Sequence, residues 1–395
     1  MQIPNIFEVI YAPRKAFKKI AEHATIIAPI LVILIYLVAN VGYFYISASK
    51  VSVEQTVPAG SLENEWTQNS TLWTNQTNVQ ISQSDDFVNG TGYLASDYYG
   101  NSSLAFSTTS NTRLVIEILE IGTVNCSNPD GYNRLSFRLK FTDPSAKPTD
   151  VLIRMFSANS SDNFYKSLNS DFAGSTTGTW NNETITLASE DWSSSSQSAD
   201  WSSITGVRLE FTWSQSSNIT ALIDGLFFHG PFISWMDIYG TSYLLNVALS
   251  SVMQFTITWI ILSGLIYLLS KFLGGTTVWR IVMIAVGVAL ITMAMLAILN
   301  AAGSSTLSNL RYPFELTAGF KGEAAADAAY SKITDQLFIS DIIGRYGWIA
   351  IQIWTAILCS VAVHVLASFT WTKSILVGAL AYVINLIIGT FLFGI

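Results

Sequence analysis

The chain has 395 residues, of which 50% are hydrophobic and only 12% are charged. Soluble domains carry about a quarter charged residues, so this composition excludes a protein that is soluble throughout and predicts a large membrane part. The formal net charge is −7. Nucleic-acid binding needs a positively charged face, so the charge balance gives that function no support.

The segment before residue 25 is predicted to be amphipathic. Its apolar side chains fall on one side of two short helices that meet near Pro13: Phe7, Ile10, Tyr11, Phe17 and Ile20. Lys and Arg cover the other side, which fits a helix lying on an anionic cytoplasmic leaflet. The alternative is ordinary positive charge beside a membrane span, with no specific role toward lipid.

Five apolar runs have about the 20 residues needed to cross a bilayer. They cover residues 25–46, 242–270, 281–299, 347–368 and 374–394. Lys and Arg lie in the N-terminal segment, in the connector 271–280 and at Lys373. The positive-inside rule therefore predicts a cytoplasmic N-terminus. Residues 47–235, the loop 300–346 and the C-terminus would then lie outside.

The first run is longer than the 7–15 residues typical of a signal peptide. We therefore favour an uncleaved anchor over a cleaved signal.

Residues 47–235 have a different chemistry and predict an all-β sandwich of the jelly-roll type. They hold nine Lys and Arg against nineteen Asp and Glu, and they are rich in Ser, Thr, Asn and Gly. Alternating apolar residues predict strands at 113–121, 133–141, 151–156, 177–187, 206–213 and 219–228. Many short strands without a helical pattern favour a sandwich. Gly230 and Pro231 are expected to end the last strand, and aromatic residues suited to a membrane interface follow.

Eight N-x-S/T sequons fall inside this insert, on the side predicted to be external. They are Asn69, Asn75, Asn89, Asn101, Asn125, Asn159, Asn182 and Asn218. A Ser/Thr/Asn-rich segment produces sequons by chance, but their clustering on one face predicts glycosylation. That modification implies a eukaryotic or archaeal cell surface, or a bacterium with such machinery.

Two stretches of the insert resemble galactose-binding-like and carbohydrate-binding-module jelly rolls. SDDFVNGTGYLASDYYGNSSLAF (84–106) is similar to the opening of that fold, and DWSSITGVRLEFTWSQSSNITALIDGLFF (200–228) to its last two strands. The resemblance implies a structural calcium at Asp224, against the alternative that Asp224 bonds a loop. It also implies sugar stacking on aromatic rings that are expected to lie in loops, against a supporting role for them in the core. The candidate rings are Trp180, Trp192, Tyr98, Tyr99 and Tyr165.

The membrane part resembles the Yip1-domain family of five-span proteins with a cytoplasmic N-terminus. The resemblance rests on an entry segment at 5–35, a Gly-Gly connector before the third span (269–299) and a closing helix pair at 353–392. The long insert departs from the family, as does the lack of a proline in the third span.

Side chains that would carry chemistry are sparse. The five apolar runs contain no Asp, Glu, Lys or Arg. Their polar residues are expected to bond between helices rather than serve transport: Asn40, Asn246, Gln254, Gln352, His364 and Asn385. Cys126 and Cys359 occupy unlike environments and build no disulfide or zinc framework, and the three histidines are far apart. No nucleotide-binding, zinc-protease or nucleophile-elbow motif is present.

The loop 300–346 contains a predicted amphipathic helix, expected to lie on the outer membrane surface beneath the sandwich.

The sequence therefore predicts a five-span α-helical bundle with a β-sandwich inserted between spans 1 and 2. Residues 1–46 form the cytoplasmic segment and first span, 47–232 the sandwich, and 233–395 the remaining spans. The expected function is a non-enzymatic, multi-pass cell-membrane protein that displays a glycan- or protein-binding domain outside. The expected partners are the lipid bilayer, a surface glycan or envelope protein, and other membrane subunits or further copies of the chain. Two alternatives stay open: an accessory subunit of a transport or secretion complex, with the sandwich as docking module, and a transporter in its own right.

Overall fold

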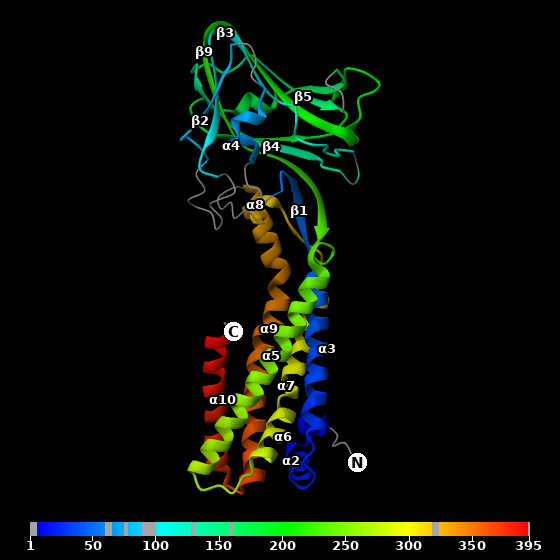
Figure 1. The fold of residues 1–395 in the computed structure, drawn as a ribbon, viewed down its shortest axis with the longest axis vertical. Coiled ribbons are helices and arrows are strands. Elements are labelled where there is room, and N and C mark those ends of the chain that lie inside the picture. The colour runs from blue at the N-terminus through cyan, green and yellow to red at the C-terminus, as the bar shows by residue number, and fades with distance from the viewer. Residues whose placement is uncertain are drawn as a thin grey trace. The chain divides into compact units, whose positions relative to one another are not determined.

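The computed structural model of the chain describes residues 6–59, 65–74, 78–88, 100–127, 129, 131–157, 161–317 and 324–393. The chain forms two compact units (Figure 1). The helical unit comprises Met1–Val51, Ser234–Leu310 and Ile333–Ile395. The sandwich unit comprises Ser52–Ile233 and Arg311–Lys332, so it is built from two pieces that are distant in sequence.

The long helices are α2 (Pro13–Glu22), α3 (Ile27–Ser49), α5 (Trp235–Phe272), α6 (Trp279–Ala289), α7 (Ile291–Ser305), α9 (Ala324–Ala367) and α10 (Trp371–Phe393). Shorter helices are α1 (Glu8–Tyr11), α4 (Glu65–Gln68) and α8 (Phe314–Thr317). As the apolar runs predict, five helical stretches are long and apolar enough to cross a membrane. They are Ile27–Ser49, Trp235–Phe272, Trp279–Ser305, Asp327–Ala367 and Trp371–Leu392.

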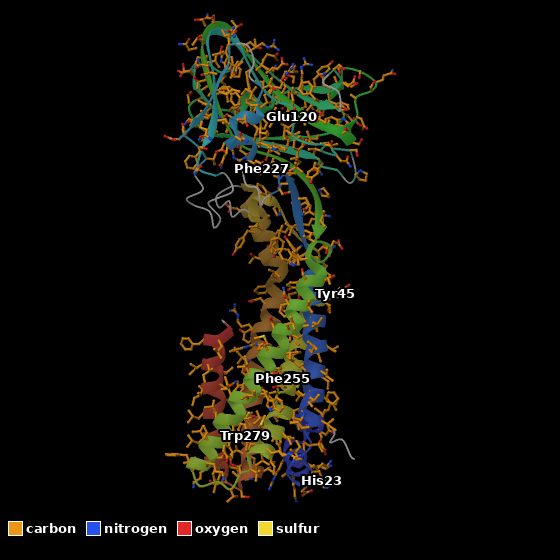
Figure 2. All side chains as sticks on the ribbon, in the orientation of Figure 1. His23, Tyr45, Glu120, Phe227, Phe255 and Trp279 are labelled. Atoms are coloured by element: carbon orange, nitrogen blue, oxygen red, sulfur yellow. The ribbon has the colours of Figure 1, made fainter. Side chains whose placement is uncertain are left out.

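The helical unit has its own apolar core, in which Phe17 and Phe255 are both 0% exposed. Figure 2 places His23 and Trp279 at one end of this unit and Tyr45 at the opposite end. The chain order of the helices and their lengths therefore bring α2 and the connector before α6 to the same end.

Three of the six polar residues expected to bond between helices do so in the described part of the chain: Asn40, Gln254 and Gln352. The Asn40 amide donates to Ser251 Oγ at 2.8 Å, and the Tyr36 hydroxyl donates to Gln254 Oε1 at 2.9 Å. Tyr382 likewise donates to Gln352. In an apolar setting such bonds satisfy groups that would otherwise be costly to bury.

The amphipathic helix predicted within the loop 300–346 is not a separate element. Residues 324–367 form the single helix α9, which joins that segment to the fourth apolar run. The last proline of the chain is Pro313, so no ring interrupts the backbone ladder after it. Gly344 and Gly347 sit within the helix without breaking it.

The strands of the sandwich unit are β1 (Val51–Val57), β2 (Gln80–Ser84), β3 (Ser103–Ile118), β4 (Arg134–Asp143), β5 (Asp150–Ser157), β6 (Asn163–Ser167), β7 (Asn181–Thr186), β8 (Ser193–Ser194), β9 (Ile204–Ser234) and β10 (Leu310–Tyr312). The first layer has the order β3-β9-β5-β6-β8. The second has the order β2-β3-β9-β4-β7. The long strands β3 and β9 serve both layers, with register shifts where they pass from one to the other.

The space between the layers is filled by alternating side chains. Leu135, Phe137, Leu139 and Phe141 of β4 are all 3% exposed or less, as their period-2 pattern predicts. These residues belong to one apolar cluster with side chains of β3, β5 and β9. An antiparallel β-sandwich joined to a set of five long apolar helices is therefore the architecture of this chain.

The last strand does not end at Gly230 and Pro231, as expected from the sequence. Strand β9 runs to Ser234, and β1 pairs beside it. A Cβ on Gly230 would lie 2.7 Å from the Tyr132 ring, so the glycine allows that ring to pack against the strand. The strands predicted at 206–213 and 219–228 are also one continuous strand, because the polar link between them stays extended.

Candidate binding face of the sandwich

The first layer carries a row of charged and aromatic residues across four neighbouring strands. Glu117 of β3 lies opposite Arg208 of β9, Arg208 opposite Arg154 of β5, and Arg154 opposite Tyr165 of β6. Successive side chains of a strand point to opposite faces, and the alternate residues Leu209 and Ile153 fill the core. The row therefore lies on the face turned away from the core, which we call the Arg–Tyr face.

Glu210 holds the arginines of this face together. Arg154 Nε donates to Glu210 Oε1 at 3.0 Å, and Arg113 pairs with the other carboxylate oxygen. Arg208 lies 3.7 Å from Glu210 and also pairs with Glu117. Burial raises the pKa of the Glu210 carboxyl, but hydrogen bonds from Arg113 and Arg154 outweigh it and hold that pKa below its usual value.

The arginines cover the carboxylates and face outward themselves. The Glu117 and Glu210 side chains are 3% and 9% exposed, whereas those of Arg154 and Arg208 are 29% and 31% exposed and that of Arg113 is 53% exposed. Because each guanidinium has five N–H donors in a fixed plane, the ion pairs leave donors that can reach a ligand.

Aromatic rings lie beneath two of these guanidinium groups. Arg154 Cζ is 5.4 Å from the centre of the Tyr165 ring, and Arg208 Cζ is 5.0 Å from that of Phe156. Arg154 also donates to Asn163 Oδ1 at 3.3 Å. Contacts of this kind orient a guanidinium plane before any ligand arrives, so the face presents donors and a ring in fixed positions.

Of the aromatic residues proposed from sequence, Tyr165 is the one that the described residues place on the Arg–Tyr face. The Trp180 indole donates to Asp86 Oδ1 at 3.2 Å. The Trp192 indole donates to the Thr186 carbonyl at 2.9 Å, and its ring packs edge-on against Trp201. Tyr98 and Tyr99 lie outside the described residues. Sugar binding at these rings stays a prediction.

Asp224 is fully buried in β9 and bonds neighbouring loops. Its carboxylate accepts hydrogen bonds from the backbone N–H groups of Val88 and Gly225, at 2.8 and 2.9 Å, and from Thr67 Oγ1 at 3.4 Å. Among the described residues, no three His, Cys, Asp or Glu side chains lie together as metal ligands would. Calcium prefers six to eight oxygen ligands, and the calcium site stays a prediction.

Five of the eight sequon asparagines lie in the described part of the chain, and all five are exposed: Asn69, Asn101, Asn125, Asn182 and Asn218. The side chain of Asn69 accepts from Thr71 and that of Asn125 from Ser127, so the sequon hydroxyl in each case bonds the amide oxygen. Arg138 donates to Asn182, and the Ser110 N–H to Asn218. Asn75, Asn89 and Asn159 lie outside the described residues, and glycosylation stays a prediction.

The arginines and glutamates of the Arg–Tyr face were not proposed from the sequence. A signal for them exists in the strands VLIRMF, GVRLEF and RLVIEI, where charged residues occupy the positions between core residues. Only 12% of the chain is charged, so charged residues between core positions on three strands indicate that these strands present one charged face. Their mutual contact depends on strand order, which the sequence pattern does not give.

Comparisons with known proteins give likeness to solved structures alone. No family model and no curated protein matches the chain. A family 11 carbohydrate-binding module from Clostridium thermocellum is 14% identical, with 41% of this chain and 91% of that chain covered and a TM-score of 0.26. A β-1,2-glucanase from Parabacteroides distasonis is 16% identical, with 42% and 25% covered and a TM-score of 0.27. Sequence identities and TM-scores this low assign no ligand to this chain.

Proposed function

We propose that this chain is a multi-pass membrane protein that displays its sandwich outside the cell and binds glycans through the Arg–Tyr face. The observation that carries the proposal is the row Glu117, Arg208, Arg154 and Tyr165, aligned across four strands with its arginines and tyrosine turned outward. Three strand spacings of about 4.8 Å make such a row about 14 Å long, which suits a short oligosaccharide.

The membrane part of the proposal is supported by the five long apolar helices. The Lys and Arg residues near their ends favour a cytoplasmic N-terminus, which would put the sandwich outside. The resemblance of the helical part to the Yip1-domain family is kept within this proposal, as a membrane-organising bundle that carries the sandwich.

Glycan binding is supported by the kinds of groups that the face presents. Sugar hydroxyls and carboxylates accept hydrogen bonds, and guanidinium groups held by Glu210 offer donors in a fixed plane. The Tyr165 ring is only partly covered by Arg154, and its exposed part adds an apolar surface that a sugar ring can contact. A face whose side chains are already positioned loses little conformational entropy on binding.

We propose a binding role rather than an enzymatic one. Glycoside hydrolysis uses two carboxyl groups placed on either side of the scissile bond. Glu117 and Glu210 are instead covered by Arg208, Arg154 and Arg113, an arrangement that suits a scaffold for donors.

A glycan array tests the proposal on the full chain purified in detergent. We expect the wild-type protein to bind a subset of glycans and Tyr165→Ala to bind them about tenfold more weakly, as for an aromatic residue central to an interface. Tyr165→Phe keeps the ring and is the matched control, expected to stay close to wild type. An array without bound glycans, or equal binding by Tyr165→Ala, would show that this face does not bind sugar.

A further inference from the structure

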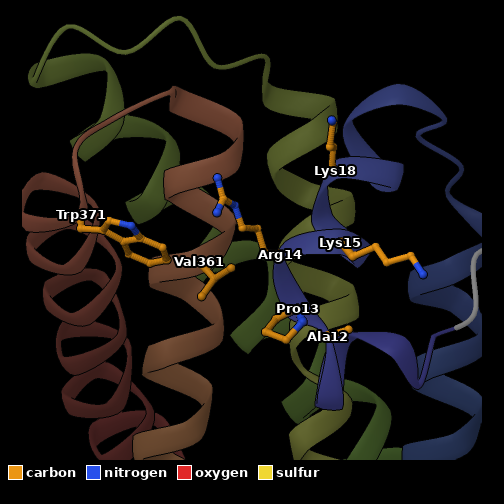
Figure 3. Close-up of a pocket in the computed structure, with 7 residues that line it drawn as sticks. All are labelled: Ala12, Pro13, Arg14, Lys15, Lys18, Val361 and Trp371. Atoms are coloured by element: carbon orange, nitrogen blue, oxygen red, sulfur yellow. The ribbon is translucent and has the colours of Figure 1, made fainter.

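A pocket of about 630 Å³ opens at the end of the helical unit that carries α2 (Figure 3). It is lined by Ala12, Pro13, Arg14, Lys15, Lys18, Val361 and Trp371. One wall is therefore cationic and comes from the start of α2. The other is apolar and comes from α9 and α10.

Helix α2 holds its cations in place by burying its opposite face. Phe17 and Ile20 are 0% and 1% exposed and belong to the core of the helical unit. Arg14 and Lys18 are four residues apart, so they lie on one side of the helix, and both are exposed. The buried side of α2 therefore fixes the orientation of the helix and the positions of Arg14 and Lys18 on its exposed side.

The four cations of α2 divide into two pairs with different surroundings. Lys15 and Lys19 both contact the Glu8 carboxylate, at 3.2 and 2.7 Å. Arg14 and Lys18 have no acidic partner among the described residues. Figure 3 shows Arg14 reaching toward the helix that carries Val361, while Lys15 points the other way. The pocket therefore contains two positive charges that the described part of the protein does not neutralise.

The apolar wall is held by contacts between its own residues. The Trp371 ring stacks on His364 with 4.0 Å between ring centres and 15° between planes. His364 Nδ1 in turn lies 2.7 Å from the Phe369 carbonyl oxygen. The start of α2 also attracts an anion, though more weakly than the two cations. Its N-cap residue Ala12 makes no side-chain hydrogen bond to the first turn, and helix N-termini favour negative charge. Cations beside a fixed apolar surface suit a group that is anionic at one end and apolar at the other.

We propose that this pocket binds the phosphate of an anionic phospholipid headgroup, held by Arg14 and Lys18 against Trp371. The inference rests on the proposed insertion of the five helices in a membrane, and it does not depend on glycan binding. A lipid is favoured over free phosphate because Val361 and Trp371 belong to two of the helices that can span a bilayer, so acyl chains would extend along them.

Native mass spectrometry of the full chain in neutral detergent tests the proposal. Phosphatidylglycerol is titrated against phosphatidylcholine, and inorganic phosphate is titrated alone. We expect a preference for phosphatidylglycerol that Arg14→Gln with Lys18→Gln weakens about 25-fold, since each cation near an anionic lipid contributes about fivefold. The pair Lys271→Gln with Arg280→Gln removes the same charge elsewhere and is expected to change binding less than threefold.

Three results would overturn the proposal. Equal loss in both double variants would indicate general electrostatics, equal binding of both lipids would remove the anionic preference, and a phosphate adduct without a lipid adduct would exclude a lipid ligand. Ala12→Phe fills the pocket while keeping every charge, so it is expected to weaken lipid binding at an unchanged melting temperature. Glycan binding is measured on the same variants and is expected to be unaltered, so the two proposals fail independently.

Discussion

Glu54 is a buried carboxylate whose partners come from stretches far apart in the chain. Arg134 donates to one oxygen, the Phe314 N–H donates to the other at 2.9 Å, and His229 Nδ1 lies 3.5 Å away. Ser136 Oγ lies 2.6 Å from His229 Nε2. All of these residues belong to the sandwich unit, so the cluster ties its two chain pieces together.

Serine hydrolases also contain a serine, a histidine and a carboxylate linked by hydrogen bonds, but there the serine is open to substrate. Here Ser136 is 7% exposed and His229 is 1% exposed. The Glu54 carboxylate, which would orient the histidine in such an enzyme, is shared with Arg134 and the Phe314 backbone. We therefore infer a structural role for these residues.

Glu54→Gln should release the segment that begins at Phe314. The exchange leaves Arg134 without its counter-ion and weakens a charge-assisted bond to the Phe314 N–H. Such a bond contributes about 1.5–3 kcal/mol, so we expect the Phe314 amide of the full chain to exchange hydrogen at least tenfold faster at neutral pH. The Ser202 amide, which bonds Asp200, serves as the internal control. Unchanged exchange at Phe314 would contradict a tethering role for Glu54.

The same contact should depend on pH. Burial raises the pKa of Glu54, but His229, Arg134 and the Phe314 N–H outweigh it and hold that pKa below its usual value. A carboxyl with a lowered folded-state pKa contributes stability that is present above its unfolded pKa, about 4.3, and lost as pH falls through the folded pKa. We therefore expect the Phe314 amide to exchange at similar rates in wild type and Glu54→Gln, measured relative to Ser202, once the pH has fallen through the folded-state pKa of Glu54. A difference that persists at pH 2 would contradict this assignment.

At the scale of elements, the close approach of α9 and α10 depends on one glycine. A Cβ on Gly378 of α10 would lie 2.5 Å from the Ser360 backbone nitrogen of α9, whereas one on Gly389 would meet no atom within 4 Å. Gly378→Ala should therefore force the helices apart and destabilise the protein by about 1–3 kcal/mol. Gly389→Ala on the same helix should be neutral or stabilising by up to about 1 kcal/mol. Thermal unfolding of the two variants in detergent compares them, and equal melting temperatures would contradict this account of the packing.

The elements that could be predicted from sequence are those with apolar residues at a regular spacing or in a long run. Strand β4 was predicted because Leu135 to Phe141 alternate, and the five apolar helices were predicted because of their length. Strands β2 and β8 were missed because their sequences, QISQS and SS, are almost wholly polar. Strand β1 was missed because VSVEQTV follows directly on an apolar helix and pairs with a distant partner. Pairing with distant strands is a tertiary effect, so local pattern does not report it.

At the scale of the whole molecule, the proposed orientation can be tested by labelling. Cys126 and Cys359 are both 0% exposed, and burial raises the pKa of the Cys126 thiol to about 12, so the native cysteines should react little. With Ser216→Cys in the sandwich and Lys271→Cys in the last turn of α5, a membrane-impermeant maleimide on intact cells should label only the first. Labelling of both after the cells are opened is the control. Labelling of Lys271→Cys in intact cells would reverse the proposed orientation.

The candidate sites were predicted from sequence to different degrees. The basic amphipathic start of the chain was visible as a pattern, but the pocket beside it requires Val361 and Trp371, more than 300 residues later. Tyr165 was proposed from its expected loop position, yet it lies in β6 next to Arg154. A sequence pattern shows which face of an element a residue occupies, whereas a site is defined by which elements lie side by side.

The contact between Glu54 and Phe314 spans 260 positions of the chain, which has a consequence for biosynthesis. Strand β10, which pairs with β1, is made only after α5, α6 and α7. The 75 residues 235–309 separate the end of β9 from β10. At about 5–20 residues per second, β1 therefore keeps an open edge for several seconds during translation. Open edges invite pairing with other chains. The sandwich of a nascent chain therefore depends on a late segment for its completion, and a chaperone that protects open strand edges has a defined interval in which to act.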